Sequence, residues 1–220
     1  MSTNYATILH EKVPLKIGKM LHFGGYCAII YCSQKNKRSD ECMYIWTAAD
    51  VSRQLAFVRE RATKLNRELN LSEVAFSLPQ HISLKISFEV DDSVADEVIS
   101  VLEDYLSSQT AFTVGQAKVE IFGSILWLSF PENECLKRLH RELDELLLSR
   151  FGVPLHEYDK CFKFHSTLFI DDGNSLGKMC SELDRLTLPS EIKIDSFLIG
   201  ISDSGKAGEY RVIKEIPSKK

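Results

Sequence analysis

The sequence lacks any apolar run long enough to cross a membrane. Of its 220 residues, 44% are hydrophobic and 26% are charged. The longest apolar runs, such as residues 125–130, are far shorter than the ~20 residues that a spanning helix needs. The first 25 residues contain scattered His, Glu and Lys and lack the apolar core of a secretory signal peptide. We therefore expect a cytoplasmic protein with no membrane function.

The sequence also lacks an excess of basic residues. It has 27 Lys and Arg against 31 Asp and Glu, which gives a formal charge of −4. Proteins that grip a long nucleic acid through its phosphates usually carry a basic excess, because each phosphate contact requires a cation. The balance favours a small phosphate-bearing substrate, or a local basic cleft on an acidic protein.

Motifs for metals, disulfides and glycine-rich nucleotide loops are absent as well. The six cysteines form no C-x-x-C pair, so we expect reduced thiols. No G-x-G-x-x-G, Walker or G-x-S-x-G motif occurs. Four of the six histidines show no local pairing with Cys or carboxylates: His10, His22, His140 and His156. We therefore expect no metal and no cofactor, and a solvated helix face for His140.

Hydrophobic periodicity predicts alternating strands and helices. The expected strands are residues 26–32, 81–90, 112–122, 125–130, 160–170, 192–201 and 210–216, and the expected helices are 49–70, from 91–93 to 107, 131–151 and 175–186. Residues 33–41 read as a polar loop. The second half repeats the order of the first, which predicts an α+β fold of two similar lobes. We expect an N-terminal extension over residues 1–21, a single domain over 22–216 and a tail over 217–220.

Two short segments repeat within that order: His81-Ile82-Ser83-Leu84 and His165-Ser166-Thr167-Leu168. Each lies on an expected strand, where side chains two residues apart share a face. One His-x-Ser/Thr segment alone is weak, because it arises by chance. Two copies at matching places of a duplicated order predict that the four side chains His81, Ser83, His165 and Thr167 converge in one cleft.

That set suits cleavage of a phosphodiester without a metal. Two imidazoles near neutrality can remove one proton and deliver another. The hydroxyls can donate to phosphate oxygens as negative charge builds there. Lys163 and Lys85 share the expected strand faces of His165 and His81, so either can supply positive charge. A nucleophilic Cys161 is disfavoured, because strand residues four apart lie about 13 Å apart. Aromatic residues that could stack on a base are Tyr26, Tyr31, Phe122, Trp127 and Tyr210.

With these residues the chain resembles the 2H phosphoesterase superfamily, in the branch of the bacterial 2′-5′ RNA ligases (LigT-like). The resemblance spans about residues 22–216. It depends on HISL at 81–84, HSTL at 165–168, GSILWLSFP at 123–131 and the closing hairpin FLIGISDSGKAGEYRVI at 197–213. Relatives often have proline before each motif, where this chain has Gln80 and Phe164. Many also carry an arginine after the second motif, where Phe169-Ile170 stand here.

The resemblance implies a bilobal, pseudo-duplicated fold in which two antiparallel sheets face a central groove and the helices lie outside. It implies metal-independent cleavage of 2′,3′-cyclic phosphates or 2′-5′-linked oligonucleotides, with His81 and His165 as general base and acid in either order and Ser83 and Thr167 as phosphate donors. The expected partners are RNA ends, small oligonucleotides or cyclic nucleotides, bound by a monomer. A non-catalytic RNA-binding module and a 3′-end RNA exonuclease are the alternatives.

Overall fold

The computed structural model describes residues 42–70, 75, 77–170 and 175–219. The expected extension, the strand at 26–32 and the loop at 33–41 lie outside these residues, as do Tyr26 and Tyr31. The helices are α1 (Ala56–Leu69), α2 (Asp92–Ser107), α3 (Glu134–Phe151) and α4 (Ser175–Leu183), with a 3₁₀ helix η2 (Glu157–Cys161). The strands are β1 (Cys42–Asp50), β2 (His81–Asp91), β3 (Phe112–Gly115), β4 (Lys118–Phe122), β5 (Ile125–Ser129), β6 (His165–Ile170), β7 (Glu191–Ile194), β8 (Ser196–Ser202) and β9 (Arg211–Pro217).

Within the described residues the strands form three antiparallel groups. A four-stranded sheet has the order β2-β1-β8-β9, a three-stranded sheet has the order β4-β5-β6, and β3 pairs with β7. The order β1-α1-β2-α2-β3 recurs as β5-α3-β6-α4-β7. The sequence pattern predicted a duplicated order, but it placed the first strand at 26–32 and did not predict β1. In each copy the strand that begins with a histidine lies at the edge of its sheet. The fold is α+β, and the two edge strands β2 and β6 lie side by side.

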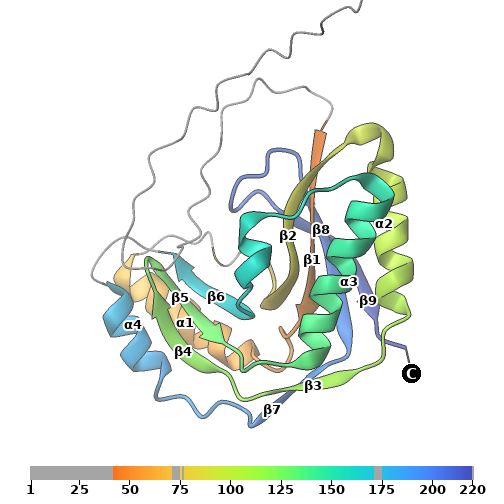
Figure 1. Cartoon of the computed structure of the whole chain (residues 1–220). Helices are drawn as coiled ribbons and strands as arrows, with labels where there is room; N and C mark the ends of the chain where they lie inside the picture. The colour runs from red at the N-terminus through yellow and green to blue at the C-terminus, as the bar shows by residue number, and fades with distance from the viewer. Residues whose placement is uncertain (1–41, 71–74, 76, 171–174, 220) are drawn as a thin grey trace, which may run out of the picture.

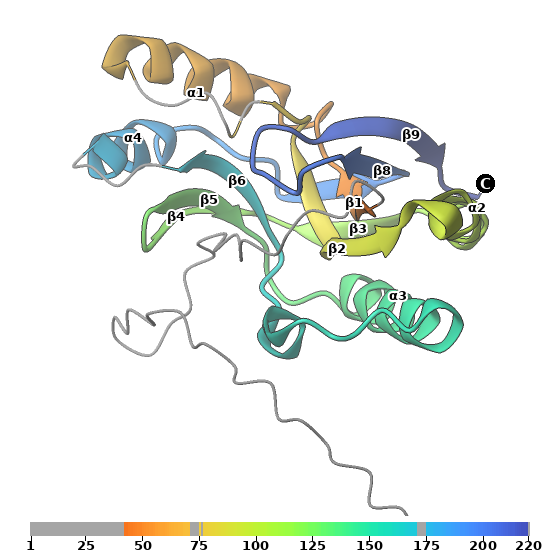
Figure 2. The same ribbon diagram turned by 90° about the horizontal axis from the view of Figure 1, so that it is seen from above.

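Helices α1 and α3, which lead into the two histidine strands, each pack on the side of the other sheet. Helix α1 connects β1 to β2, yet it packs against α4, which covers β4 and β5 (Figure 2). Arg61 of α1 and Glu182 of α4 form an ion pair of 2.7 Å. In turn α3, which connects β5 to β6, packs on β2. These helix contacts connect the two sheets whose edge strands carry the histidines.

Local chemistry sets the helix ends. The Asp91 carboxylate accepts from the Ser93 backbone N–H and begins α2, as its sequence predicted. Asn133 caps α3 in the same way, two residues after Pro131, so the helix begins later than expected. Gly152 ends α3 with φ 68°, a conformation that favours glycine.

Several expected boundaries were wrong. The segment 49–70 is not one helix, because residues through Asp50 continue β1 and the helix begins at Ala56. Residues 112–122 form two strands, since the chain leaves β7 and joins β5 between Gly115 and Lys118. Residues 192–201 likewise divide at Asp195 into strands of different sheets. Helix α4 ends at Leu183 rather than at residue 186.

The chain end is attached to the fold. The Ser218 and Lys219 backbone N–H groups donate to the carbonyls of Asp195 and Gln109, so residues expected as a tail are hydrogen bonded to the domain. Among the described residues, the large apolar core lies between the sheets and the helices, and a second small cluster contains Trp46, Ala48, Leu198 and Tyr210. No helix in the described ranges is both long enough and apolar enough to cross a bilayer.

Candidate active site

The structure brings the two His-x-Ser/Thr segments onto neighbouring strands. In β2, His81 and Ser83 are partly exposed while Ile82 between them is fully buried. In β6, His165 and Thr167 are partly exposed while Ser166 is buried. Each motif therefore turns its histidine and hydroxyl to the same side, as the strand periodicity predicts.

Both imidazoles are held by the same backbone contact. Nδ1 of His81 lies 2.8 Å from the Pro79 carbonyl oxygen, and Nδ1 of His165 lies 2.7 Å from the Lys163 carbonyl oxygen. A carbonyl can only accept, so Nδ1 donates and carries the proton in each neutral ring. Nε2 is then the basic nitrogen of both histidines, which is the atom that can exchange a proton with a substrate.

A tryptophan packs against each histidine ring. The Trp46 and His81 ring centroids are 4.8 Å apart, and those of Trp127 and His165 are 4.2 Å apart. Trp46 lies on β1 and Trp127 on β5, the strands that pair with β2 and β6. A Cβ at Gly200 would lie 2.3 Å from Nε1 of Trp46, so glycine at that position lets the indole reach its place. The rings are thus fixed by one hydrogen bond and one indole each.

Burial by surrounding protein lowers the pKa of both histidines. For His81, desolvation is the main cause; the Pro79 hydrogen bond and the Asp50 carboxylate oppose it, while the charge of Arg59 adds to it. For His165, desolvation lowers the pKa to about 4; the Lys163 carbonyl opposes it and the charge of His81 adds to it. The influence of His81 on His165 is the expected consequence of two ionisable rings in one site.

Sequence reasoning missed several of these neighbours. Trp46 and Asp50 lie on β1, which was not predicted, and Arg59 lies on α1 far from the motifs in sequence. The Arg59 guanidinium donates to the Leu78 carbonyl, and burial lowers its pKa. The aromatic and β-branched run Tyr44-Ile45-Trp46-Thr47 is a strand pattern that could have revealed β1.

A recess of about 440 Å³ opens beside His165. Its walls include Trp127, Ser129, Phe162 and Lys163. The Lys163 ammonium lies 5.3 Å from the centre of the Phe122 ring, which in turn stacks on Trp127 at 4.6 Å. Two of the predicted aromatic residues, Phe122 and Trp127, therefore belong to the His165 side of the site.

Lys163 and Cys161 do not lie on the strand of His165. The strand expected over residues 160–170 begins only at His165, because His156 caps the 3₁₀ helix η2. Lys163 lies between η2 and β6 and reaches the recess from that segment.

Lys85 is not at the surface of the site, contrary to the expected strand face. Its side chain is 2% exposed, and its Nζ lies 2.6 Å from Asp144 Oδ1 and 2.5 Å from Asp159 Oδ2. Tyr210 is also buried, and its hydroxyl contacts the Ser87 hydroxyl at 2.5 Å and the Gly205 carbonyl at 3.2 Å. Neither side chain is directed at the histidines by these contacts.

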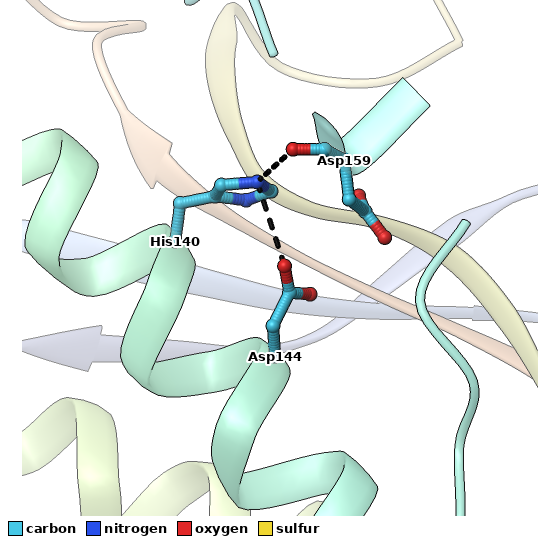
Figure 3. A group of neighbouring side chains, drawn as sticks. All are labelled: His140, Asp144 and Asp159. Carbon is cyan, nitrogen blue, oxygen red and sulfur yellow. Dashed lines mark hydrogen bonds and ion pairs between the residues drawn. The ribbon is translucent and has the colours of Figure 1, made fainter. Parts of the chain in front are cut away.

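Figure 3 shows a group with the ligand types of a metal site: His140, Asp144 and Asp159. His140 is buried rather than solvated; Nδ1 donates to the Leu84 carbonyl at 2.7 Å, and Nε2 lies 3.5 Å from Asp144 Oδ2. The Lys85 ammonium lies against both carboxylates and supplies the positive charge that a metal would otherwise bring. We therefore assign this group, with Lys85, as a buried ion-pair cluster.

Comparison with known proteins identifies the family. The sequence model described as the 2′-5′ RNA ligase superfamily matches residues 54–205. The chain belongs to the 2′-5′ RNA ligase superfamily. The matched segment contains both histidine motifs, α1 through β8, and all of the recess. No curated protein sequence is similar enough to match the chain.

Solved structures show the same fold at low sequence identity. E. coli LigT complexed with 3′-AMP is 18% identical with a TM-score of 0.53; the alignment covers 82% of this chain and 100% of that one. E. coli LigT complexed with NADP+ is 19% identical with a TM-score of 0.51, covering 82% and 99%. TT0787 of Thermus thermophilus is 15% identical with a TM-score of 0.53, covering 79% and 97%. These likenesses establish the LigT-like fold for this superfamily member.

Proposed function

We propose that this chain is a phosphodiesterase that cleaves 2′,3′-cyclic phosphates or 2′-5′ linkages of small oligonucleotides or RNA ends. The observation that carries the proposal is the matched pair His81 and His165, each clamped through Nδ1 so that Nε2 is basic. Superfamily membership supports a phosphoesterase-type activity. The 3′-AMP and NADP+ complexes of LigT show that a protein of this fold can hold nucleotides.

The chemistry requires one ring of the pair to be neutral and the other to be protonated. The neutral ring removes a proton from the attacking water through Nε2, and the protonated ring delivers one to the leaving oxygen. Ser83 and Thr167 donate to non-bridging oxygens, where charge builds as the new P–O bond forms. Arg59 on the His81 side and Lys163 on the His165 side provide positive charge for the phosphate. The recess beside His165 is large enough for part of a nucleotide.

The test is incubation with 2′,3′-cyclic AMP and with a 2′-5′-linked diadenylate in the presence of EDTA. We expect turnover by the wild-type chain and its loss in His81→Ala and in His165→Ala. His156→Asn is the matched control and should keep full activity, because it replaces an exposed histidine outside the recess and leaves a side chain that can cap η2. Normal turnover by either active-site variant would refute the two-histidine mechanism.

A non-catalytic RNA-binding module is the second candidate. Phe169 and Ile170 occupy the positions where an arginine was expected from the resemblance, and Phe169 is fully buried in the core. Binding of adenylates without cleavage of any phosphodiester, measured with the wild-type chain, would favour this role over catalysis.

A further inference from the structure

Gln80 is a buried polar residue that directly joins the two catalytic strands. It precedes His81 and is 5% exposed. Its side-chain Nε2 donates to Ser166 Oγ at 3.0 Å and to the Thr167 carbonyl at 3.4 Å. The Thr167 carbonyl can only accept, which fixes the amide orientation. These bonds therefore cross from the strand of His81 to the strand of His165.

The contact links residues that adjoin the two histidines in the chain. Gln80 is covalently bonded to His81, and Ser166 is covalently bonded to both His165 and Thr167. On its own side, the Gln80 carbonyl accepts from the Val51 N–H at 3.1 Å, so its backbone is held to the end of β1. In the described part of the chain, β2 and β6 belong to different sheets and share no backbone ladder. The Gln80 side-chain bonds therefore hold β2 against β6 where no backbone ladder does.

We propose that Gln80 is a positioning residue that sets the spacing and register of His81 relative to His165. A base and an acid that act on opposite sides of one phosphorus atom must keep a fixed separation. A misplacement of about 1 Å can cost a factor of ~100 in rate. Gln80 touches neither ring in these contacts and acts through the two strands. The inference depends on the proposed function only where activity is measured.

The test uses Gln80→Met, which keeps the length of the side chain and removes its donor. Gln109→Met is the matched control, because Gln109 is 8% exposed and its Nε2 donates to the Tyr105 carbonyl at 3.0 Å, outside the active site. We expect Gln80→Met to lower kcat by about tenfold or more with KM within about twofold. Gln109→Met should leave both constants unchanged. Ser166→Ala, which removes one of the two acceptors, should lower kcat by a smaller factor and serves if Gln80→Met does not fold.

A second readout does not require turnover. The imidazole resonances of His81 and His165, followed by NMR, should move in Gln80→Met and stay in place in Gln109→Met. Equal movement in both variants, or an unchanged kcat in a folded Gln80→Met protein, would overturn the proposal. If the wild-type chain cleaves no phosphodiester, the proposed function fails, and the histidine resonances alone decide whether Gln80 positions the pair.

Discussion

His81 and His165 begin equivalent strands and are held alike, but the residues opposite them differ in charge. Asp50 is the cross-strand partner of His81, and Ser129 is the cross-strand partner of His165. The Asp50 carboxylate accepts from the Ser52 N–H at 2.8 Å and raises the pKa of His81 against the effect of burial. His165 has no carboxylate among the causes of its lowered pKa. The duplicated fold thus supplies two similar rings in different electrostatic surroundings.

The same two strands differ again four residues further on. Lys85 on β2 and Phe169 on β6 are both nearly or fully buried, at 1% and 0% exposure. Phe169 belongs to the apolar core, whereas Lys85 enters the ion-pair cluster with Asp144 and Asp159. The cluster connects β2 to α3 and η2, the segments that lead into β6. At this position β6 is therefore held by apolar packing and β2 by buried charge.

If the two rings act as one catalytic unit, removing both should cost little more than removing one. His81→Ala and His165→Ala should each lower kcat by about 10²- to 10⁴-fold. The kcat of the double variant should be no more than about threefold below that of the less active single variant, because the effects of residues that act as a unit are non-additive. Single-turnover rates with the best substrate measure this. Multiplicative losses would mean that the two histidines act independently.

The strand periodicity of the two motifs predicted β2 and the histidine–hydroxyl faces, and the residues at 91–93 predicted the cap of α2, because these features depend on residues within a few positions. It failed for Lys85, because the β1–β2 register shifts between Thr47 and Ala48. Leu84 and Lys85 are consequently both buried, and the alternation that places Ser83 beside His81 does not extend to Lys85. Local periodicity cannot reveal such a bulge, which depends on the pairing strand.

The roles of Gln80 and Trp46 could not be predicted for a related reason. Gln80 acquires its role from Ser166, 86 residues away, and Trp46 from the ring of His81. The packing of α1 and α3 on the side of the other sheet also cannot be predicted from the sequence of either half alone. Long-range contacts of this kind depend on how the two repeats pack against each other. The duplicated order predicts that two repeats exist, but it does not predict the geometry of their packing.

Replacing the buried charge of β2 should destabilise the fold far more than a change at the matching site of β6. Lys85→Met leaves Asp144 and Asp159 buried without their ammonium, which should cost about 3–5 kcal/mol of unfolding free energy. Phe169→Leu, a smaller change of apolar volume, should cost less than about 1.5 kcal/mol. Urea titration of both variants measures the two costs. Equal losses would show that the cluster contributes no more than ordinary packing.

Substituting the cross-strand partners of the two histidines should shift the histidine pKa values in opposite directions. Asp50→Asn removes a charge that favours the imidazolium, so the pKa of His81 should fall further. Ser129→Asp adds such a charge opposite His165 and should raise the pKa of His165 above about 4. Histidine NMR titrations measure both.

The pH dependence of the wild-type rate follows from the same pair. Above the higher pKa both rings are neutral and the acid is lost; below the lower pKa both are protonated and the base is lost. Since both pKa values lie below 6.5, kcat/KM should be greatest on the acidic side of pH 6.5. A maximum at or above pH 7.5 would contradict the lowered pKa values.

The smallest effect is expected from the exposed lysine on the His165 side. Lys163 lines the recess and its ammonium lies over Phe122, so it can approach the phosphate or base of a bound nucleotide without contributing to proton transfer. Lys163→Met should raise KM by about three- to tenfold and leave kcat within about twofold, the pattern of lost ground-state binding. Lys160→Met removes another exposed lysine, from η2, and should change neither constant. If both variants raise KM alike, the effect comes from the general charge of this segment rather than from a contact made by Lys163.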